Sequence, residues 1–295
     1  MEPGDPIVQQ TLNLNALLPR LKTSAPHIVA GLAFIVLFWA PFRLLLRDWW
    51  TDPDAGHGLL LAPLAIWLLW RLGRIPDARG QPAAGLALLA ASVVLRYLSG
   101  LAAELFSMRL SMLGAMAGLS IFAYGWRQLV HWWLPALLLL FSVPIPDVVT
   151  GSLALPLQLK ASQLGAAMLQ SRQVPVLLAG NVIEIPGHRL FVTEACSGLR
   201  SLTALLSMAV LVGGFWLSRP WSRVLLLAAA IPVAMALNGV RIFLTGFLVY
   251  YVDPALGEGF MHYSEGWAIF VVAFGILGAV AWVLGGMERR GNAVT

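Results

Sequence analysis

The chain has 295 residues, of which 59% are hydrophobic and only 11% are charged, and its mean hydropathy is +0.80. Soluble domains carry about 25% charged residues, so this composition excludes an ordinary soluble domain and predicts a polytopic membrane protein. The formal net charge of +5 does not indicate nucleic-acid binding, because the basic residues stand singly or in pairs between apolar segments.

Apolar stretches recur along the chain, and crossing the hydrocarbon core takes a helix of about 20 residues. Eight transmembrane helices are predicted, at residues 27–46, 56–72, 83–100, 104–124, 128–146, 194–217, 222–245 and 266–286. The fold class expected is therefore an all-α polytopic membrane protein with one integral-membrane domain over residues 27–286, between an N-terminal segment (1–26) and a tail (287–295).

The positions of the basic residues predict the orientation of the chain. The bases that stand in short loops or in the tail, directly at span ends, are Arg71, Arg74, Arg79, Arg219, Arg223, Arg289 and Arg290. Such bases favour the cytoplasmic side, so both termini are expected in the cytoplasm. The second, sixth and eighth spans then begin on the extracytoplasmic side.

The longest stretch without a span, residues 147–193, is expected to be an extracytoplasmic insertion. Residues 151–170 are weakly amphipathic and predict a helix at the membrane interface. The β-branched residues that follow, with turn signals at Gly180-Asn181 and Pro186-Gly187, predict a small β-hairpin that leads directly to Cys196.

Three chemically reactive residues fall on the extracytoplasmic side in this topology. Cys196, the only cysteine of the chain, begins the sixth span, Arg241 ends the seventh, and His262 precedes the eighth. A lone cysteine is often a small buried hydrophobe, and an arginine at a span end often extends to lipid headgroups. The start of a helix, however, stabilises a thiolate. The alternative to a purely structural role is therefore that the cysteine, the arginine and the histidine form a functional site.

The three residue types together have the chemistry of acyl transfer. A thiolate attacks an acyl carbon, an imidazole moves the proton, and a fixed guanidinium stabilises the oxyanion. The nearby residues that are candidates for a supporting role are Glu194, Arg200, Asn238, His57 and Glu265. No cofactor or metal is expected, because no pair of histidines has metal-ligand spacing and one cysteine cannot build a multi-cysteine zinc site.

The segments "EACSGLRSL", "AIPVAMALNGVRI" and "FMHYSEGW", preceded by "FSVPIPDVV" and "GNVIEIPG", resemble the exosortase/archaeosortase family. By motif, the cysteine, arginine and histidine of that family correspond to Cys196, Arg241 and His262. One departure is that family members often have Tyr-Ser-His-Gly where this chain has Ala55-Gly56-His57-Gly58.

The resemblance implies a membrane cysteine peptidase or transpeptidase of the bacterial inner membrane, with its active site on the extracytoplasmic side. Its expected partners are the lipid bilayer and membrane-inserted proteins that end in a Pro-Glu-Pro-type motif, an apolar helix and a basic tail. The enzyme would cleave this sorting signal and pass the product to water or to an envelope acceptor. The alternative is a non-enzymatic transporter or a scaffold for exopolysaccharide assembly, in which Arg200 and Arg241 line a solute path.

Overall fold

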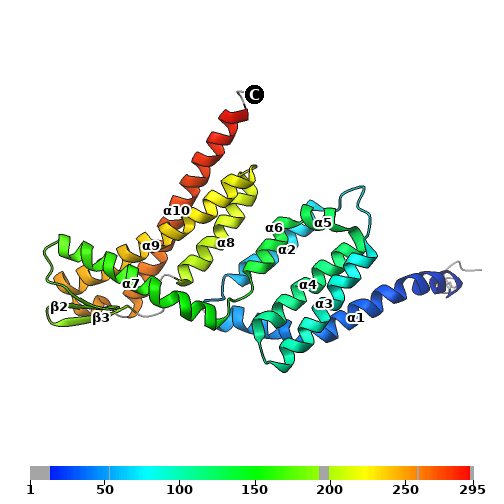
Figure 1. The fold of residues 1–295 in the computed structure, drawn as a ribbon, viewed down its shortest axis with the longest axis horizontal. Helices are drawn as coiled ribbons and strands as arrows, with labels where there is room; N and C mark the ends of the chain where they lie inside the picture. Colours follow the sequence, from blue (N-terminus) through cyan, green and yellow to red (C-terminus); the bar gives the residue numbers. More distant parts are fainter. Residues whose placement is uncertain (1–13, 53, 193–198, 258, 293–295) are drawn as a thin grey trace, which may run out of the picture.

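The computed structural model describes residues 14–52, 54–192, 199–257 and 259–292 (Figure 1). The first half of the chain forms helices α1 (Leu14–Thr51), α2 (Gly58–Leu72), α3 (Pro82–Leu101), α4 (Leu105–Tyr124), α5 (Trp126–His131) and α6 (Trp133–Phe141). The second half forms α7 (Asp147–Ser171), strands β1 (Leu177–Ala179), β2 (Val182–Ile185) and β3 (His188–Phe191), α8 (Leu199–Trp216), α9 (Pro220–Tyr251), η2 (Pro254–Gly257) and α10 (Gly259–Asn292). The molecule is thus mostly helical, as the composition predicts.

Five helical segments are long and apolar enough to cross a membrane, within the part of the chain that the structure describes. They are Val29–Thr51, Pro82–Leu101, Leu105–Tyr124, Pro220–Tyr251 and Ala268–Arg290. Two shorter apolar helices, Gly58–Leu72 and Leu202–Trp216, coincide with the second and sixth expected spans. The structure therefore supports a polytopic membrane protein, and the full number of eight spans stays a prediction.

The expected fifth span, residues 128–146, is wrong as a single helix. The structure instead has two short helices, α5 and α6, which are separated at Trp132. Pro135 explains the break, because it has no N–H to donate to the carbonyl of His131 one turn earlier. The Trp132 indole Nε1 donates instead to the Gly73 carbonyl at 2.8 Å, which ties this break to the end of α2.

The helices form two groups that meet where α6 packs against α8 (Figure 1). Leu134 and Leu138 of α6 lie in one apolar cluster with Val210 of α8. Beside this contact the Arg223 guanidinium donates to the Leu217 carbonyl at 2.7 Å and lies 4.5 Å from the centre of the Trp133 ring. Apolar packing and one cation–π contact therefore join the two halves.

The helix ends lie at two levels along the helix axes, as the contacts between them show. At one level the His57 ring, just before α2, contacts the Phe141 carbonyl at the end of α6, and Asp48 near the end of α1 pairs with Arg109 near the start of α4. At the other level Gln128 of α5 hydrogen-bonds to the main chain just after α2. This alternation is the arrangement expected when successive helices cross a bilayer in opposite directions.

The insertion at residues 147–193 is partly as expected. The predicted interfacial helix corresponds to α7, but the expected single hairpin is wrong, because the strands form a three-stranded antiparallel sheet in the order β1-β2-β3. Both turn signals make a turn, with Gly180 and Gly187 at positive φ of 64° and 82°, and two turns give three strands. One face of the sheet packs on α7 and α9 through Ile183 and Ile185.

Glycines allow α7 and α9 to cross closely next to this sheet. A Cβ at Gly165 of α7 would lie 2.5 Å from Cγ2 and 2.9 Å from Cβ of Ile242, and a Cβ at Gly239 of α9 would lie 2.4 Å from the Leu164 side chain. Small residues at such crossings let two backbones approach, as is common in membrane helices. This crossing holds the stretch of α9 that contains Asn238 and Arg241.

Gly165→Ala is expected to destabilise the protein by about 1 to 3 kcal/mol, because the added methyl overpacks the crossing. Gly151→Ala on the same helix is the matched control, since no atom lies within 4 Å of the place that its added methyl would take. Thermal unfolding in detergent should show a lower midpoint for Gly165→Ala and an unchanged or higher midpoint for Gly151→Ala. Equal midpoints for the two variants would contradict the close crossing.

Candidate functional site

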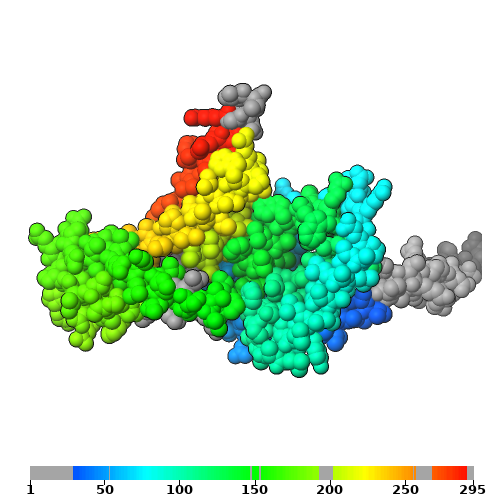
Figure 2. Space-filling model, viewed as in Figure 1, coloured from blue at the N-terminus to red at the C-terminus, as the bar shows by residue number. Residues whose placement is uncertain are grey.

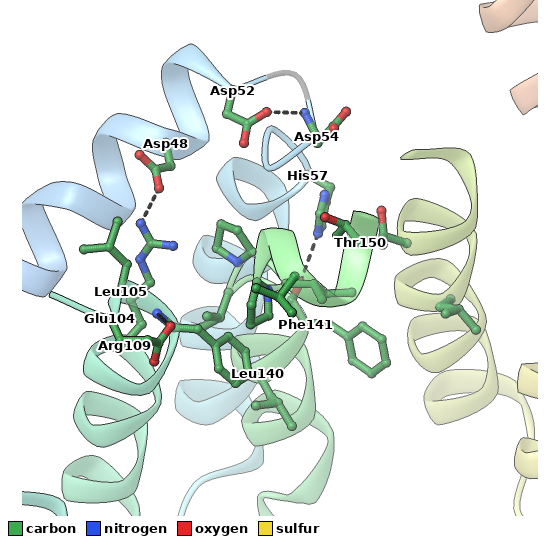
Figure 3. Close-up of a pocket in the computed structure, with 18 of the residues that line it drawn as sticks. Asp48, Asp52, Asp54, His57, Glu104, Leu105, Arg109, Leu140, Phe141 and Thr150 are labelled. Carbon is green, nitrogen blue, oxygen red and sulfur yellow. Dashed lines mark hydrogen bonds and ion pairs between the residues drawn. The ribbon is translucent and has the colours of Figure 1, made fainter. Parts of the chain in front are cut away.

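A cavity of about 720 Å³ lies at the level of the His57 ring (Figure 3). Its wall comes from the end of α1 and the segment between α1 and α2, from the turn before α4 and the start of α4, from the end of α6 and the segment after it, and from the first turns of α7 and α8. The polar residues that line it are Asp48, Asp52, Asp54, His57, Glu104, Arg109, Thr150 and Thr203. We call this space the helix-end cavity, and its volume is that of an ordinary small-ligand or peptide-residue site.

A buried ion pair forms one side of the helix-end cavity. Arg109 Nη2 of α4 donates to Asp48 Oδ2 of α1, and the side chains are 5% and 29% exposed, respectively. The Arg109 Nε is buried and has no hydrogen-bond acceptor among the residues described. Because a buried guanidinium is costly without a counter-charge, the Asp48 carboxylate offsets part of the cost of burying Arg109 beside the cavity.

Glu104 caps the helix that carries Arg109. Its carboxylate oxygens accept hydrogen bonds from the backbone N–H groups of Phe106 at 2.9 Å and Ser107 at 2.7 Å. The pKa of Glu104 lies below its ordinary value of 4.5, first because the Ser107 side chain donates a hydrogen bond, then because of these backbone donors, with a smaller contribution from Arg109. The capped helix start therefore carries a negative charge at neutral pH.

His57 is the histidine of the helix-end cavity. Its Nε2 lies 3.0 Å from the Phe141 carbonyl oxygen, which can only accept, so Nε2 carries a hydrogen in this contact. In the neutral ring Nδ1 is then the nitrogen that accepts a proton. His57, expected from the sequence in a supporting role, is thus held by the end of α6 with its ring in the wall of the cavity (Figure 3).

Two of the predicted site residues, Glu194 and Cys196, lie outside the described residues. Arg200 lies in the first turn of α8, and His262 and Glu265 lie in the first two turns of α10. The contacts of these five side chains therefore stay predictions.

Arg241 and Asn238 lie one turn apart on α9, where Asn238 is buried and Arg241 is half-buried. Neither belongs to the wall of the helix-end cavity, as far as the described residues define it. Among the predicted residues whose side chains the structure describes, His57 is the one placed in that wall.

The backbones of α8, α9 and α10 bring the start of α8, the turn of α9 that holds Arg241 and the first turns of α10 to a similar level. Gly213 of α8 lies beside Leu226 of α9, and Gly285 of α10 lies beside Leu217 of α8, so α8 and α10 run parallel with α9 antiparallel to them. Each helix rises about 1.5 Å per residue. Counting back to Leu199 at the start of α8 therefore reaches Val240 of α9, next to Arg241, and residue 267 in the third turn of α10, five residues beyond His262.

The start of α8 also reaches the helix-end cavity, because Thr203 and Leu206 line it. The segment 193–198 joins the sheet to this helix. The cavity with His57 and the level shared by the three motifs thus meet at the first turns of α8.

Sequence reasoning did not single out Asp48, Glu104 or Arg109. A signal for Arg109 was available, because a charged residue inside an apolar span is rare and is usually functional or paired. The identity of its partner was not available, since Asp48 lies on another helix and nothing in the spacing links the two. In the described parts of the chain, no cluster of three or more His, Cys, Asp or Glu side chains is arranged as a metal site.

Comparison with known proteins gives one match. The family model described as transmembrane exosortase matches residues 49–279, a range that runs from the end of α1 to α10 and includes every predicted site residue. No curated protein and no solved structure matches the chain.

The Glu104 cap predicts a pH-dependent stability. Because the pKa of Glu104 is lower in the folded protein than in the unfolded chain, its stabilisation is fully present above the ordinary value of 4.5 and is lost as the pH falls through the folded pKa. Glu104→Gln should therefore lower stability by about 0.5 kcal/mol at neutral pH and by progressively less in acid. Thermal midpoints measured from pH 7 downward, with Asp77→Asn in an exposed loop as control, test this. A deficit that is constant with pH would contradict it.

The Asp48–Arg109 pair predicts an asymmetric pair of substitutions. Asp48→Asn leaves a buried guanidinium without its counter-charge and is expected to cost about 3 kcal/mol. Arg109→Met should cost less, because the partly exposed Asp48 carboxylate can still be hydrated, and the double variant should regain part of the Asp48→Asn loss. A double-mutant cycle on unfolding free energies measures this, and additive losses would show that the two groups do not stabilise each other.

Proposed function

The chain belongs to the transmembrane exosortase family, and from this membership we propose that it is an integral-membrane cysteine transpeptidase or peptidase. Its substrates are exported proteins that end in a sorting signal: a short Pro-Glu-Pro-type motif, an apolar helix and a basic tail. The substrate helix lies among the spans with its basic tail in the cytoplasm. The scissile bond then meets Cys196 at the extracytoplasmic surface of the inner membrane.

The proposed reaction is acyl transfer through a thioester. The Cys196 thiolate attacks the carbonyl carbon of the scissile peptide bond, and Arg241 stabilises the oxyanion of the tetrahedral intermediate. The C–N bond breaks as His262 gives the leaving amine the proton that it took from the thiol. Water or a nucleophile of the envelope then attacks the thioester and releases the acyl group, and the thiol recovers its proton.

One observation carries the proposal. The family match spans the segments of Cys196, Arg241 and His262, and the helix that begins just after Cys196 opens onto a cavity of about 720 Å³. His57 lies in this cavity with its ring fixed by the Phe141 carbonyl, so a second imidazole is available as a base or a substrate contact. Polar groups from α1, the segment between α1 and α2, α4 and α7 give the cavity the means to hold a peptide.

Cys196→Ala is expected to lower processing of a co-expressed, tagged substrate by about 10³-fold or more, because the nucleophile is gone. Thr203→Cys in the Cys196→Ala background should not restore processing, since it places a thiol in the wall of the helix-end cavity but at a different position in the chain. Immunoblotting of precursor and product measures both, with equal amounts of enzyme in the membrane fraction as the folding control.

Undiminished processing by Cys196→Ala would overturn the enzymatic proposal. The transporter or scaffold alternative would then be favoured, and for it the loss of exopolysaccharide export in Arg200→Gln or Arg241→Gln would be the positive sign.

A further inference from the structure

Strand β3 is an edge strand that leads toward the proposed nucleophile. Among the described residues it pairs with β2 alone, and it ends at Phe191, shortly before Cys196 in the chain. Val192 N–H donates to the Asn181 carbonyl at 3.0 Å, and backbone hydrogen bonds alternate along an antiparallel strand. His188, Leu190 and Val192 therefore direct their backbone groups toward β2. Arg189 and Phe191 direct theirs to the free edge.

The same two residues present their side chains on the exposed face of the sheet. The cross-strand pairs on this face are Glu184 with Arg189 and Val182 with Phe191, while Ile183 and Leu190 face the core. Arg189 Nε donates to Glu184 Oε1 at 3.0 Å, and both Arg189 and Phe191 are exposed. In Figure 2 the lobe formed by the end of α7 and the sheet stands clear of the first-half helices. The free edge thus offers a backbone donor and acceptor pair beside a guanidinium, next to an aromatic ring.

We propose that β3 binds the extended recognition segment of the substrate as a fourth strand, with an acidic residue of that segment opposite Arg189. This inference rests on the proposed function and identifies the part of the protein that binds the substrate of that reaction. Main-chain hydrogen bonds from Arg189 and Phe191 supply affinity, and the charge of the Arg189 side chain supplies selectivity. The carboxylate would extend the row of alternating charges Glu184, Arg189, carboxylate across the sheet.

The geometry of an added strand also fits a motif with a proline on each side of the acidic residue. In a strand only every second residue turns its N–H and C=O toward a given neighbour. When the acidic residue opposite Arg189 bonds to β3, both flanking residues turn their backbones outward, where proline's missing N–H costs no hydrogen bond. Those prolines then form a new outer edge that cannot recruit a further strand.

Two observations favour β3 over β1, the other edge of the sheet. The chain runs from β3 through residues 193–198 to α8, whereas β1 follows α7, so a peptide on β3 lies nearer in the chain to the proposed nucleophile. The exposed side chains of β1 are Leu177 and Ala179, which offer no charge to an acidic residue. The charge of Arg189 and the short distance in sequence from β3 to Cys196 therefore both favour β3 as the peptide-binding edge.

Photo-crosslinking in the intact membrane protein tests this assignment. A photoreactive phenylalanine analogue is placed at Phe191 or, as the matched control, at Leu177, because these two side chains are 63% and 64% exposed on the same face at opposite edges. The probe is a synthetic peptide of about ten residues with one glutamate between two prolines, and the control peptide has lysine in place of glutamate. Both positions are tested in the Cys196→Ala variant, so that the enzyme does not cleave the peptide.

We expect labelling from position 191, little labelling from position 177, and about tenfold less labelling from position 191 with the lysine peptide. The double variant Arg189→Glu/Glu184→Arg keeps the ion pair within the sheet but reverses the charge at the edge, so it should now prefer the lysine peptide. Lys160→Glu makes the same change of charge on exposed α7 and should leave the preference unaltered. A purely structural role of Arg189 predicts that the double variant behaves like the unaltered protein.

Equal labelling from the two edges, or a preference that ignores the charge at position 189, would overturn the assignment. Because crosslinking reports binding without catalysis, its result is independent of the Cys196 processing assay. Lost processing in Cys196→Ala with no labelling at position 191 would reject the β3 site and keep the proposed function. Labelling at position 191 with undiminished processing in Cys196→Ala would keep the β3 site and reject the cysteine mechanism.

Discussion

The absence of water around the spanning segments is the constraint on which the rest of this structure depends. Backbone groups in hydrocarbon must be paired within helices, so irregular chain and most charged side chains are confined to the helix ends. In this protein the ends fall at two levels, and one of them collects Asp48, His57, Glu104 and Arg109 around the helix-end cavity. Chemistry that needs polar groups therefore has few places to reside, and this cavity is one of them.

The same constraint explains why the site is assembled from many helices. No single helix end supplies more than a few polar groups, so the cavity takes its wall from α1, α4, α6, α7, α8 and the segment before α2. The Asp48–Arg109 pair fixes α1 and α4 to each other. On the other side of the molecule, the glycine crossing of α7 and α9 sets the position of Arg241 and supports the sheet. The first turns of α8 line the cavity, and α8 packs on α9, so this helix lies between the two regions.

Much of this organisation could be predicted from the sequence, for identifiable reasons. The apolar runs gave the positions of the long helices, and the turn residues at Gly180 and Gly187 marked both reversals of the sheet. The break at Trp132 was missed because hydropathy continues through it, although Pro135 was a local signal. The third strand was missed because a three-residue strand such as β1 has too short an alternation to detect. The Asp48–Arg109 pair and the hydrogen bond of His57 to Phe141 join positions far apart in the chain, and no local pattern encodes such partners.

The central claim is that the lone thiol opens into the helix-end cavity, and the single cysteine makes this directly measurable. Thr150→Cys adds a second thiol in the cavity wall, and Asp77→Cys adds one in an exposed loop at the opposite level, with no other thiol to compete. A short bifunctional thiol reagent is then applied to each variant in membranes, and internal crosslinks are identified by mass spectrometry. The account predicts a crosslink between positions 150 and 196 and none between 77 and 196. A crosslink only to position 77, or a Cys196 that reacts only with lipid-soluble reagents, would contradict it.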